Sequence, residues 1–584
     1  MRTVGGLASA SGAQWWPGLA MALAAALAIT CTPSPSGDFR GAPRQEATSP
    51  RPKVLTIGVL NSIAGYGPWN FNITGGGANS VAEVHTMGLV SIDTAGELEP
   101  RLAAKLPSLD DGTLVVAPDG RMDTTWKIRP GARWQDGAPV TADDFAFSFQ
   151  LLSDPDFLSA ASKEILQAES VEAPDPATLV VHWRTPFSRA LDMDFRRFWP
   201  FPKHLLGEPF QGDRQAFKAL PYFSTEYVST GPFRLVDFGL GEQQVYERFD
   251  GYFLGRPKLD TVIIKTIGNA SVLAANLQAG TVDIAADKTF SDDVAMQLRD
   301  TWQQSGAGTV LSRQNNVLYG LFQFDPQFAR PVELSQDVRL RRGLLYAVDR
   351  DAIRESMLPG FPNTSGDSFM LVQDPRAKLA GQPFARYPYD PARAVESFAA
   401  GGWRQTGDGR LVDREGRRVE IEVRGALDTW SREVSLVADA WRRMGIDASE
   451  TVPARAARDN EYVSVFPGIV IRARGAGETF LDAFDGRAQA TAENRWAGGN
   501  NGHYANQALD SILDAIAATL DEQRQGQLLR EAGEIMAEDL PMMPLYYRTT
   551  FAAVRKGVRA LTDDFSAGGE VGGMARNAHL WDLD

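Results

Sequence analysis

The stretch Trp126-Lys-Ile-Arg129-Pro-Gly131-Ala-Arg-Trp134-Gln-Asp136-Gly137-Ala-Pro139-Val-Thr141-Ala-Asp-Asp144-Phe decides the fold of this chain. Residues 124–129 alternate polar and apolar side chains as a half-buried strand does, and the pattern stops at a Pro-Gly pair. An Asp-Gly turn follows, and Thr141 and Asp144 then stand at the spacing of a helix capping box. Strand, turn and capped helix form a folding motif, so this stretch indicates scaffold rather than a ligand site.

On both sides of this motif, short strands alternate with helices. The β-branched run 54–60 is bounded by turn residues, which predicts the first strand of a buried sheet. Apolar periodicity and capping residues predict helices over 337–357, 391–401 and 428–444, a strand over 446–452, and two helices within 506–540 that separate near Asp521. This alternation favours an α/β architecture, and 584 residues are enough for several domain-sized units.

The segment 126–145 closely resembles the signature of the family 5 extracellular solute-binding proteins, the dipeptide-, oligopeptide- and nickel-binding components of ABC importers. Other segments resemble further elements of that family and occur in the family's order. They are Glu97–Pro107, Ser229–Phe233, Leu277–Ile284, Asp337–Arg350, Ala399–Trp403 and Glu538–Leu545. The matches run from about residue 55 to the C-terminus, and seven segments in order are strong evidence where one would be weak.

The resemblance implies an α/β, two-lobed periplasmic-binding-protein clamshell of type II, in its large peptide-binding form with an extra subdomain. Lobe I would comprise residues 54–312 and 545–584, with the extra subdomain at about 90–225, and lobe II residues 313–544. Two strands would pass from one lobe to the other and form the hinge, and ligand contacts from both lobes would stabilise the closed form. The importer's permease and ATPase would be separate chains, since the sequence has no Gly-x-x-x-x-Gly-Lys-Ser/Thr loop. We expect a monomer.

Charge and cysteine content limit other possibilities. The net charge of −14 disfavours electrostatic binding to nucleic acid or to anionic lipid. Cys31 is the single cysteine, which excludes an internal disulfide framework and a cysteine-based zinc site.

The N-terminal region has the features of an export signal. Residues 19–29 are eleven consecutive apolar residues, fewer than the ~20 that span a membrane but typical of a signal peptide. Because Cys31 follows closely, residues 1–31 resemble a bacterial lipoprotein signal with a lipidated cysteine; the alternative is ordinary cleavage that leaves a free thiol. Residues 32–53 are Pro-rich and predict a disordered linker. We therefore expect a location in the periplasm or cell envelope, with a lipid anchor outside the cytoplasmic membrane.

One candidate ligand loop is charged. Peptide-binding relatives have an aromatic- and Asp-rich loop where this chain reads Phe466–Phe480, and the acid that would pair a peptide's ammonium group is not visible there. Arg472, Arg474 and Glu478 could bind an anionic or differently placed ligand, and a solvated charge cluster is the equally weighted alternative.

The other candidates are aromatic and amide side chains, most of them beside glycines. They are Trp496, Asn500, Tyr504, Tyr66, Trp69, Asn70 and Tyr319. Trp496, Asn500 and Tyr504 suit a wall that stacks on a ligand and bonds its amides, and a packed loop is the alternative. Tyr66, Trp69 and Asn70 follow the first strand, where crevices form in open α/β sheets. Tyr319 lies near the proposed hinge.

No pattern in the sequence indicates catalysis or a cofactor. The nucleophile elbow and His-Glu-x-x-His are absent, and the five histidines are scattered without an i,i+4 pair, so a metal site is a poor fit. We therefore expect a binding protein for a peptide or peptide-like solute. The alternatives are an oligosaccharide, an opine or a chelated metal as ligand, a sensor instead of a permease as partner, and, remotely, a secreted hydrolase.

Overall fold

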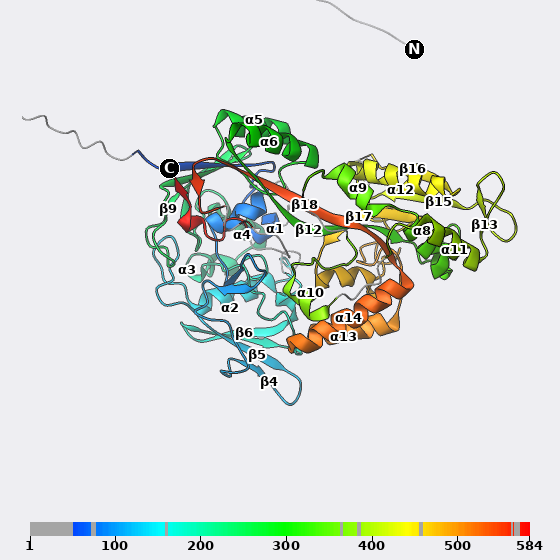
Figure 1. Cartoon of the computed structure of the whole chain (residues 1–584). Coiled ribbons are helices and arrows are strands. Elements are labelled where there is room, and N and C mark those ends of the chain that lie inside the picture. The colour runs from blue at the N-terminus through cyan, green and yellow to red at the C-terminus, as the bar shows by residue number, and fades with distance from the viewer. Residues whose placement is uncertain are drawn as a thin grey trace, which may run out of the picture. The chain divides into compact units, whose positions relative to one another are not determined.

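The computed structural model describes residues 51–71, 77–157, 162–361, 366–381, 387–454, 459–561, 565 and 573–584 (Figure 1). The chain divides into two compact units, Met1–Arg51 and Pro52–Asp584. The predicted signal segment with Cys31, and the predicted linker up to residue 50, lie outside the described residues. Lys53, at the end of that linker, donates its backbone N–H to Asp260 at 2.7 Å, and its Nζ bonds to Asp582. Of the helices in the described ranges, none combines the length and apolarity that crossing a membrane requires.

A ten-stranded mixed sheet runs through the second unit. In spatial order its strands are β16 (Asp447–Thr451), β15 (Glu420–Gly425), β17 (Ile469–Gly475), β12 (Gly308–Phe322), β18 (Met542–Arg555), β11 (Ile284–Ala285), β1 (Val54–Val59), β10 (Thr261–Thr266), β9 (Gln243–Arg248) and β8 (Phe233–Gly239). β1 pairs in parallel with β10 and β11, and β18 lies antiparallel between β11 and β12. The middle of the sheet is therefore completed by a strand that comes late in the chain.

Smaller sheets accompany the large one. A four-stranded sheet has the order β4 (Leu114–Val116), β5 (Met122–Lys127), β7 (Thr178–Trp183), β6 (Ala168–Asp175). Three two-stranded ribbons pair β2 (Val90–Ile92) with β3 (Leu98–Pro100), β13 (Arg404–Gln405) with β14 (Leu411–Val412), and β19 (Val558–Arg559) with β20 (Asp582–Leu583).

The predicted strand and capped helix of the opening motif are confirmed as β5 and α2 (Ala142–Leu152). The Asp144 carboxylate accepts the backbone N–H of Thr141 at 2.9 Å, as a capping box requires. It also accepts Trp134 Nε1–H at 3.1 Å and the backbone N–H of Lys203 at 2.9 Å. One buried carboxylate thus joins the strand's turn, the helix and the chain that follows β7.

The same motif is also bonded to the predicted 229–233 segment. The Gln135 amide donates to the carbonyls of Gly231 and Phe233 at 3.0 and 2.8 Å and accepts the backbone N–H of Ser229 at 3.0 Å. A Cβ on Gly231 would lie 2.3 Å from the backbone of His85, so only glycine permits this contact. Both segments therefore act as scaffold.

The helices follow the capping signals. They are α1 (Pro68–Phe71), α2, α3 (Lys203–Leu206), α4 (Arg214–Lys218), α5 (Ala270–Ala279), α6 (Asp292–Ser305), α7 (Glu333–Gln336), α8 (Val338–Tyr346), α9 (Arg350–Met357), α10 (Pro375–Ala380), α11 (Pro391–Gly401), α12 (Ser431–Arg443), α13 (Gln507–Ala518) and α14 (Glu522–Asp539). The prediction of one helix over 337–357 is wrong. The Asp349 side chain accepts the backbone N–H of Ala352 and begins a new helix, α9, so the segment is divided.

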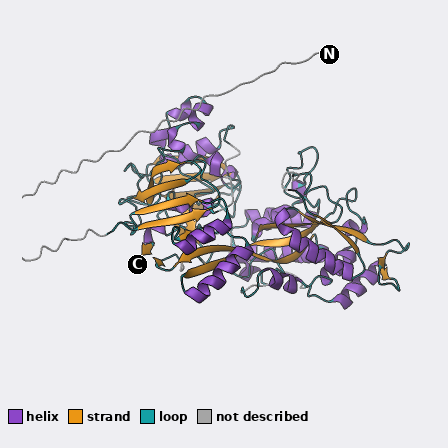
Figure 2. Ribbon diagram, turned by 90° about the horizontal axis from the view of Figure 1, so that it is seen from above, coloured by secondary structure: helices purple, strands orange, loops and turns teal. Residues whose placement is uncertain are grey.

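Two clusters of buried hydrophobic side chains fill the unit. Members of one come mainly from residues 55–264 and 552–581, and members of the other from residues 267–553. β12 and β18 contribute to both clusters. Figure 2 shows the strands packed against helices throughout the unit. The predicted lobe boundaries stay a prediction, and residues 267–302, assigned there to lobe I, contact the second cluster.

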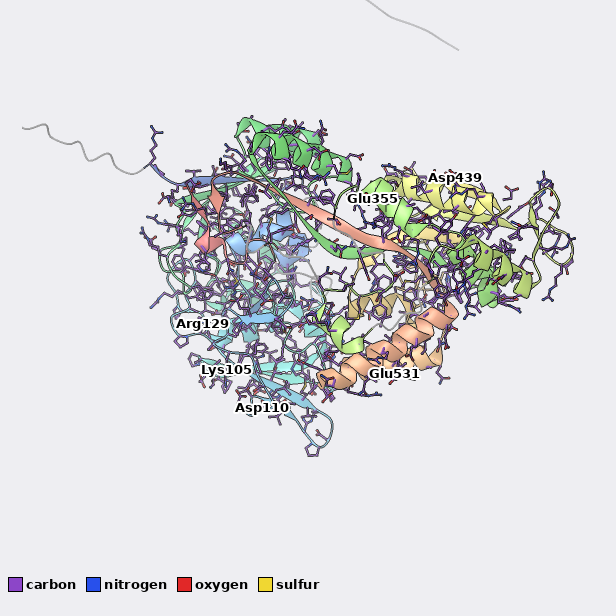
Figure 3. All side chains as sticks on the ribbon, viewed as in Figure 1. Lys105, Asp110, Arg129, Glu355, Asp439 and Glu531 are labelled. Carbon is purple, nitrogen blue, oxygen red and sulfur yellow. The ribbon has the colours of Figure 1, made fainter. Side chains whose placement is uncertain are left out.

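Charged side chains such as Lys105, Asp110, Glu355 and Asp439 lie exposed on the outside (Figure 3).

Candidate functional site

A cavity of about 500 Å³ lies where distant segments of the chain meet beside β12. Its walls come from the 3₁₀ segment η1 (Ala78–Val84), residues 163–197, Lys288 three residues after the short strand β11, β12 and β17 themselves, and the 3₁₀ segment η8 (Glu478–Phe484). The described lining includes seven bases and two acids: Lys163, Arg189, Arg196, Arg197, Lys288, Arg313 and Arg474, with Glu164 and Asp482. We call this space the basic cavity.

Two of the arginines are held by one buried carboxylate. Asp194, 2% exposed, accepts Arg196 Nη2–H at 2.6 Å and Arg197 Nη1–H at 3.1 Å. Burial alone would raise the pKa of Asp194, but attraction by the two guanidinium groups lowers it below its ordinary value. Asp194 therefore stays ionised and orients both arginines at the cavity wall.

Glu164 neutralises part of the positive charge of the lining. Its Oε1 lies 2.9 Å from Arg189 Nη2 and 3.5 Å from Arg197 Nε. The Nε of Arg189 also lies 3.0 Å from Asp192 Oδ2. These side chains form a continuous ionic network at the basic cavity.

Lys288 and Arg313 enter the cavity from the middle of the sheet. Arg313, on β12, is ion-paired to the fully buried Asp287. Lys288 follows Asp287 in the chain and has a left-handed backbone with φ of 61°. Its backbone N–H donates to Thr550 Oγ1 on β18 at 2.9 Å. Its side chain is exposed in the cavity yet surrounded by protein. Loss of hydration and repulsion by Arg313 and Arg196 lower the pKa of Lys288, although attraction by Asp287 acts in the opposite direction.

An irregularity in β12 lies at the same wall. The register of β12 with β18 shifts between Gln314 and Asn316, so Asn315 is an extra residue on β12. Asn315 and Asn316 both line the cavity. Such bulges redirect side chains beside binding sites, and here the bulge presents two amides, which can donate to ligand oxygens.

Two smaller cavities adjoin the basic cavity and share Arg189 and Thr479 with it. Their volumes are about 260 and 160 Å³. Glu478 lines both of them and accepts an ion pair from Arg376 at 2.9 Å, with Arg189 Nε 3.8 Å away. This chain of ion pairs joins residues near 189 to residues near 376 and 478 beside the basic cavity.

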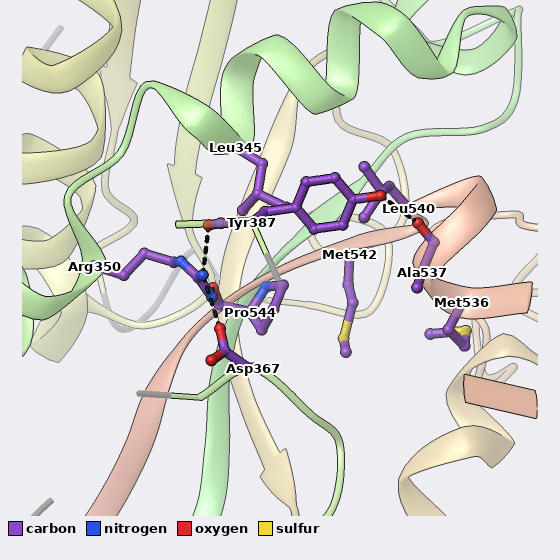
Figure 4. Close-up of a pocket in the computed structure, with 9 residues that line it drawn as sticks. All are labelled: Leu345, Arg350, Asp367, Tyr387, Met536, Ala537, Leu540, Met542 and Pro544. Atoms are coloured by element: carbon purple, nitrogen blue, oxygen red, sulfur yellow. Dashed lines mark hydrogen bonds and ion pairs between the residues drawn. The ribbon is translucent and has the colours of Figure 1, made fainter. Parts of the chain in front are cut away.

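A further small cavity is structural. It has a volume of about 20 Å³, room for about one water, and lies among α9, α14 and β18 (Figure 4). Buried Arg350 pairs there with Asp367 at 2.8 Å and donates to the Tyr387 carbonyl at 2.7 Å, while the Tyr387 hydroxyl donates to Ala537 at 2.8 Å. These satisfied bonds fix the packing and leave no room for a solute.

The charged candidates lie at or near the basic cavity. Arg474 lines it and donates to the Thr479 carbonyl at 2.9 Å. Glu478 borders the two adjoining cavities. Arg472, two residues before Arg474 on β17, bonds to the Asn501 amide oxygen instead. A ligand role for these three residues remains a prediction.

The candidates after β1 are packed inward. Tyr66 is 2% exposed, stacks on Tyr227 at 3.9 Å and shares a 2.7 Å hydrogen bond with the hydroxyl of Tyr246. Burial raises its pKa well above the ordinary value. Trp69 packs edge-on against Phe223 at 4.7 Å, and the N–H of half-buried Asn70 donates to Gly67 at 2.9 Å. None of the three candidates, Tyr66, Trp69 and Asn70, is in the lining of the basic cavity.

The remaining aromatic and amide candidates also make internal contacts. The Asn500 amide donates to the carbonyls of Asp485 and Tyr504, at 3.0 and 2.7 Å, and the Tyr504 hydroxyl bonds to Asp539. Half-buried Trp496 packs near Phe328 with ring centroids 6.2 Å apart. These contacts are those of the packed-loop alternative.

Tyr319 is also enclosed. It is fully buried on β12 and packs edge-on against Phe480 at 5.0 Å. The basic cavity is thus built largely from residues that the sequence did not single out, among them Arg196, Lys288 and Arg313. A usable signal was the local pairing of acid and base in Asp194-Phe-Arg196-Arg197 and Asp287-Lys288.

Comparison with known proteins decides the family. The model of the "Bacterial extracellular solute-binding proteins, family 5 Middle" matches residues 97–491. The chain belongs to this family. As a family 5 member it is a solute-binding protein of ABC transport and not an enzyme, which confirms the resemblance found in the sequence.

Relatives of this family 5 protein have several named ligands. The oligopeptide-binding protein AppA of Bacillus subtilis is 23% identical over 75% of this chain and 77% of its own. The glutathione-binding protein GsiB of Salmonella typhi is 22% identical over 87% and 91%. NikA from Brucella suis, solved with Fe(III)-EDTA, superimposes with a TM-score of 0.69 at 18% identity, over 91% of this chain and 100% of its own. The predicted α/β clamshell of the large peptide-binding form is thereby confirmed as the fold.

Proposed function

We propose that this chain captures a small peptide-like solute outside the cytoplasm and delivers it to the permease of an ABC importer. The basic cavity carries the proposal. Its volume of about 500 Å³ falls in the ~300–1,000 Å³ range of small-molecule sites. The named ligands of the similar proteins, an oligopeptide, glutathione and an EDTA chelate, support a small solute with amide or carboxylate groups.

Closure around the solute is the proposed mechanism. The cavity walls come from both predicted lobes, 54–312 and 313–544, so a bound solute would contact both and stabilise the arrangement in which they lie close. β12 and β18, with 15 and 14 residues, extend over roughly 50 Å at ~3.4 Å per residue. Because both strands contribute to both hydrophobic clusters, they suit a two-strand hinge.

The test begins with the solute that accompanies the protein. The protein is purified without denaturation, released ligand is identified by mass spectrometry, and calorimetry follows with di- to pentapeptides. We expect a stoichiometric solute and a smaller radius of gyration in X-ray scattering when it is added. A sugar, an opine or a metal chelate as the only ligand would change the solute and keep the importer role. An unchanged radius with every tested solute would refute capture by closure.

A further inference from the structure

Resting on the proposed function, we propose that the basic cavity selects a dianionic solute, one that carries two carboxylate or phosphate groups and no compensating positive charge.

The charges of the described site do not cancel. The seven lining bases face two lining acids, Glu164 and Asp482. Three more carboxylates pair with the same bases from outside the lining: Asp192, Asp194 and Asp287. Seven bases against five acids leave an excess of two positive charges. Glu478 does not alter this balance, since its near partner is Arg376 at 2.9 Å.

The excess lies on two lysines. Within the described part of the chain, the lining bases that form no ion pair are Lys163 and Lys288. The buried carboxylates Asp194 and Asp287 are 2% and 0% exposed and lie behind the arginines that they orient. A solute in the cavity would therefore meet the cationic groups of these arginines and not Asp194 or Asp287, while Glu164 and Asp482 remain in the lining.

Lys288 has a backbone conformation that residues with a side chain rarely adopt. A left-handed φ of 61° is unfavourable for a residue with a side chain, and such strain persists where the surroundings fix it. The surroundings here are the Thr550 hydroxyl on the Lys288 N–H and the Arg313 pair on Asp287. This geometry directs the ammonium group into the cavity beside Arg313 and Arg196, where an anion would relieve their mutual repulsion.

Neutral donors complete the site. Asn315 and Asn316 at the β12 bulge, with Ser80 on η1, offer hydrogen bonds to the oxygens of an oxyanion. Both described lining acids already lie beside arginines, Glu164 within 3.5 Å of two of them and Asp482 within 4.0 Å of Arg474, which weakens their attraction for a ligand ammonium group. Dianions are therefore favoured over zwitterionic and cationic peptides of the same size.

The experiment compares solutes that differ in charge. Calorimetry on the full protein uses succinate, inorganic pyrophosphate and N-acetylated Glu-Ala as anions, with trialanine and trilysine as references. We expect at least one anion to bind 10-fold or more tightly than trialanine, and its affinity to fall as NaCl is raised. The carboxylate and phosphate arms distinguish the two oxyanion chemistries.

Variants then locate the effect. Lys288→Gln is expected to weaken binding of the favoured anion about 10- to 100-fold, the loss of one hydrogen bond between charged groups. Lys105→Gln makes the same change at an exposed, distant lysine and should leave the affinity unchanged (Figure 3). Arg196→Gln provides a second test if Lys288→Gln lowers the melting temperature.

Two outcomes would overturn the inference. One is tighter binding of trialanine or trilysine than of every anion, which would leave capture of a solute intact and remove its charge selectivity. The other is equal affinity in Lys288→Gln and Lys105→Gln. Failure of the proposed function itself is recognised separately, since no solute of any charge would then bind.

Discussion

The buried carboxylate of Asp144 gives the sharpest test of the scaffold. Asp144→Ala removes the acceptor of three N–H groups: Thr141 at 2.9 Å, Trp134 at 3.1 Å and Lys203 at 2.9 Å. Each buried donor left without a partner costs about 1–3 kcal/mol. Burial raises the pKa of Asp144 in the native protein, so the variant also avoids the cost of holding an ionised group there, which offsets part of the loss. We expect the free energy of unfolding to fall by about 3 kcal/mol.

The adjacent acid is the matched control. Asp143, one residue earlier on α2, is exposed and pairs with Lys203 Nζ at 2.7 Å, a surface interaction worth about 0–1 kcal/mol. Urea unfolding followed by tryptophan fluorescence should show a shifted midpoint for Asp144→Ala with an unchanged slope, and almost no shift for Asp143→Ala. Equal shifts in the two variants would refute the reasoning. Solute affinity should be unchanged in both, since neither residue lines the basic cavity.

Four further tests address other parts of the molecule. Burial lowers the pKa of His85 to about 3 in the folded protein, whereas an unfolded histidine titrates near ~6.5. The unfolded state therefore binds one more proton between these values, and the free energy of unfolding falls as the pH drops from ~6.5 toward 3. His85→Phe should reduce this loss between pH 7 and pH 4 by about 3 kcal/mol, and an unaltered loss would contradict the prediction. Glu478→Gln breaks the ion pair with Arg376 and should cost about 1–3 kcal/mol of unfolding free energy in 50 mM NaCl and less in 1 M NaCl; a salt-independent cost would count against it. Arg474→Ala should weaken solute binding without changing the melting temperature of the solute-free protein, whereas Trp496→Ala, outside the basic cavity, should bind normally; the reverse would place the site at the Trp496 loop. Labelled palmitate should be incorporated in cells and lost in Cys31→Ser, and no incorporation in the parent protein would exclude the lipid anchor.

Local signals in the sequence predicted the elements of the fold well. The strand at β5, the box at Thr141 and Asp144, and the paired α13 and α14 all depend on residues within one or two turns of each other. The segment 337–357 was mistaken for one helix because Asp349 fits the polar face of a helix as well as it fits a cap. A cap is distinguished from a surface position only by the backbone around it.

The site was harder to predict, since its residues meet only through strand pairing. Lys288 and Arg313 are brought together because β18 lies between β11 and β12, a neighbour relation without a local signature. Charge alone identified Arg474, which lines the cavity. The aromatic candidates have partners inside the protein, since buried tyrosine hydroxyls also need hydrogen bonds. Tyr66 bonds to Tyr246 and Tyr504 to Asp539, and a ligand role for these side chains stays a prediction.

The late position of β18 has a consequence for biosynthesis. Until residues 542–555 have emerged, β11 and β12 each lack the neighbour that separates them, and both present unpaired backbone edges. The nascent polypeptide therefore cannot complete its central sheet until most of its residues have been synthesised. Truncation before residue 542 should yield aggregates rather than a smaller folded domain.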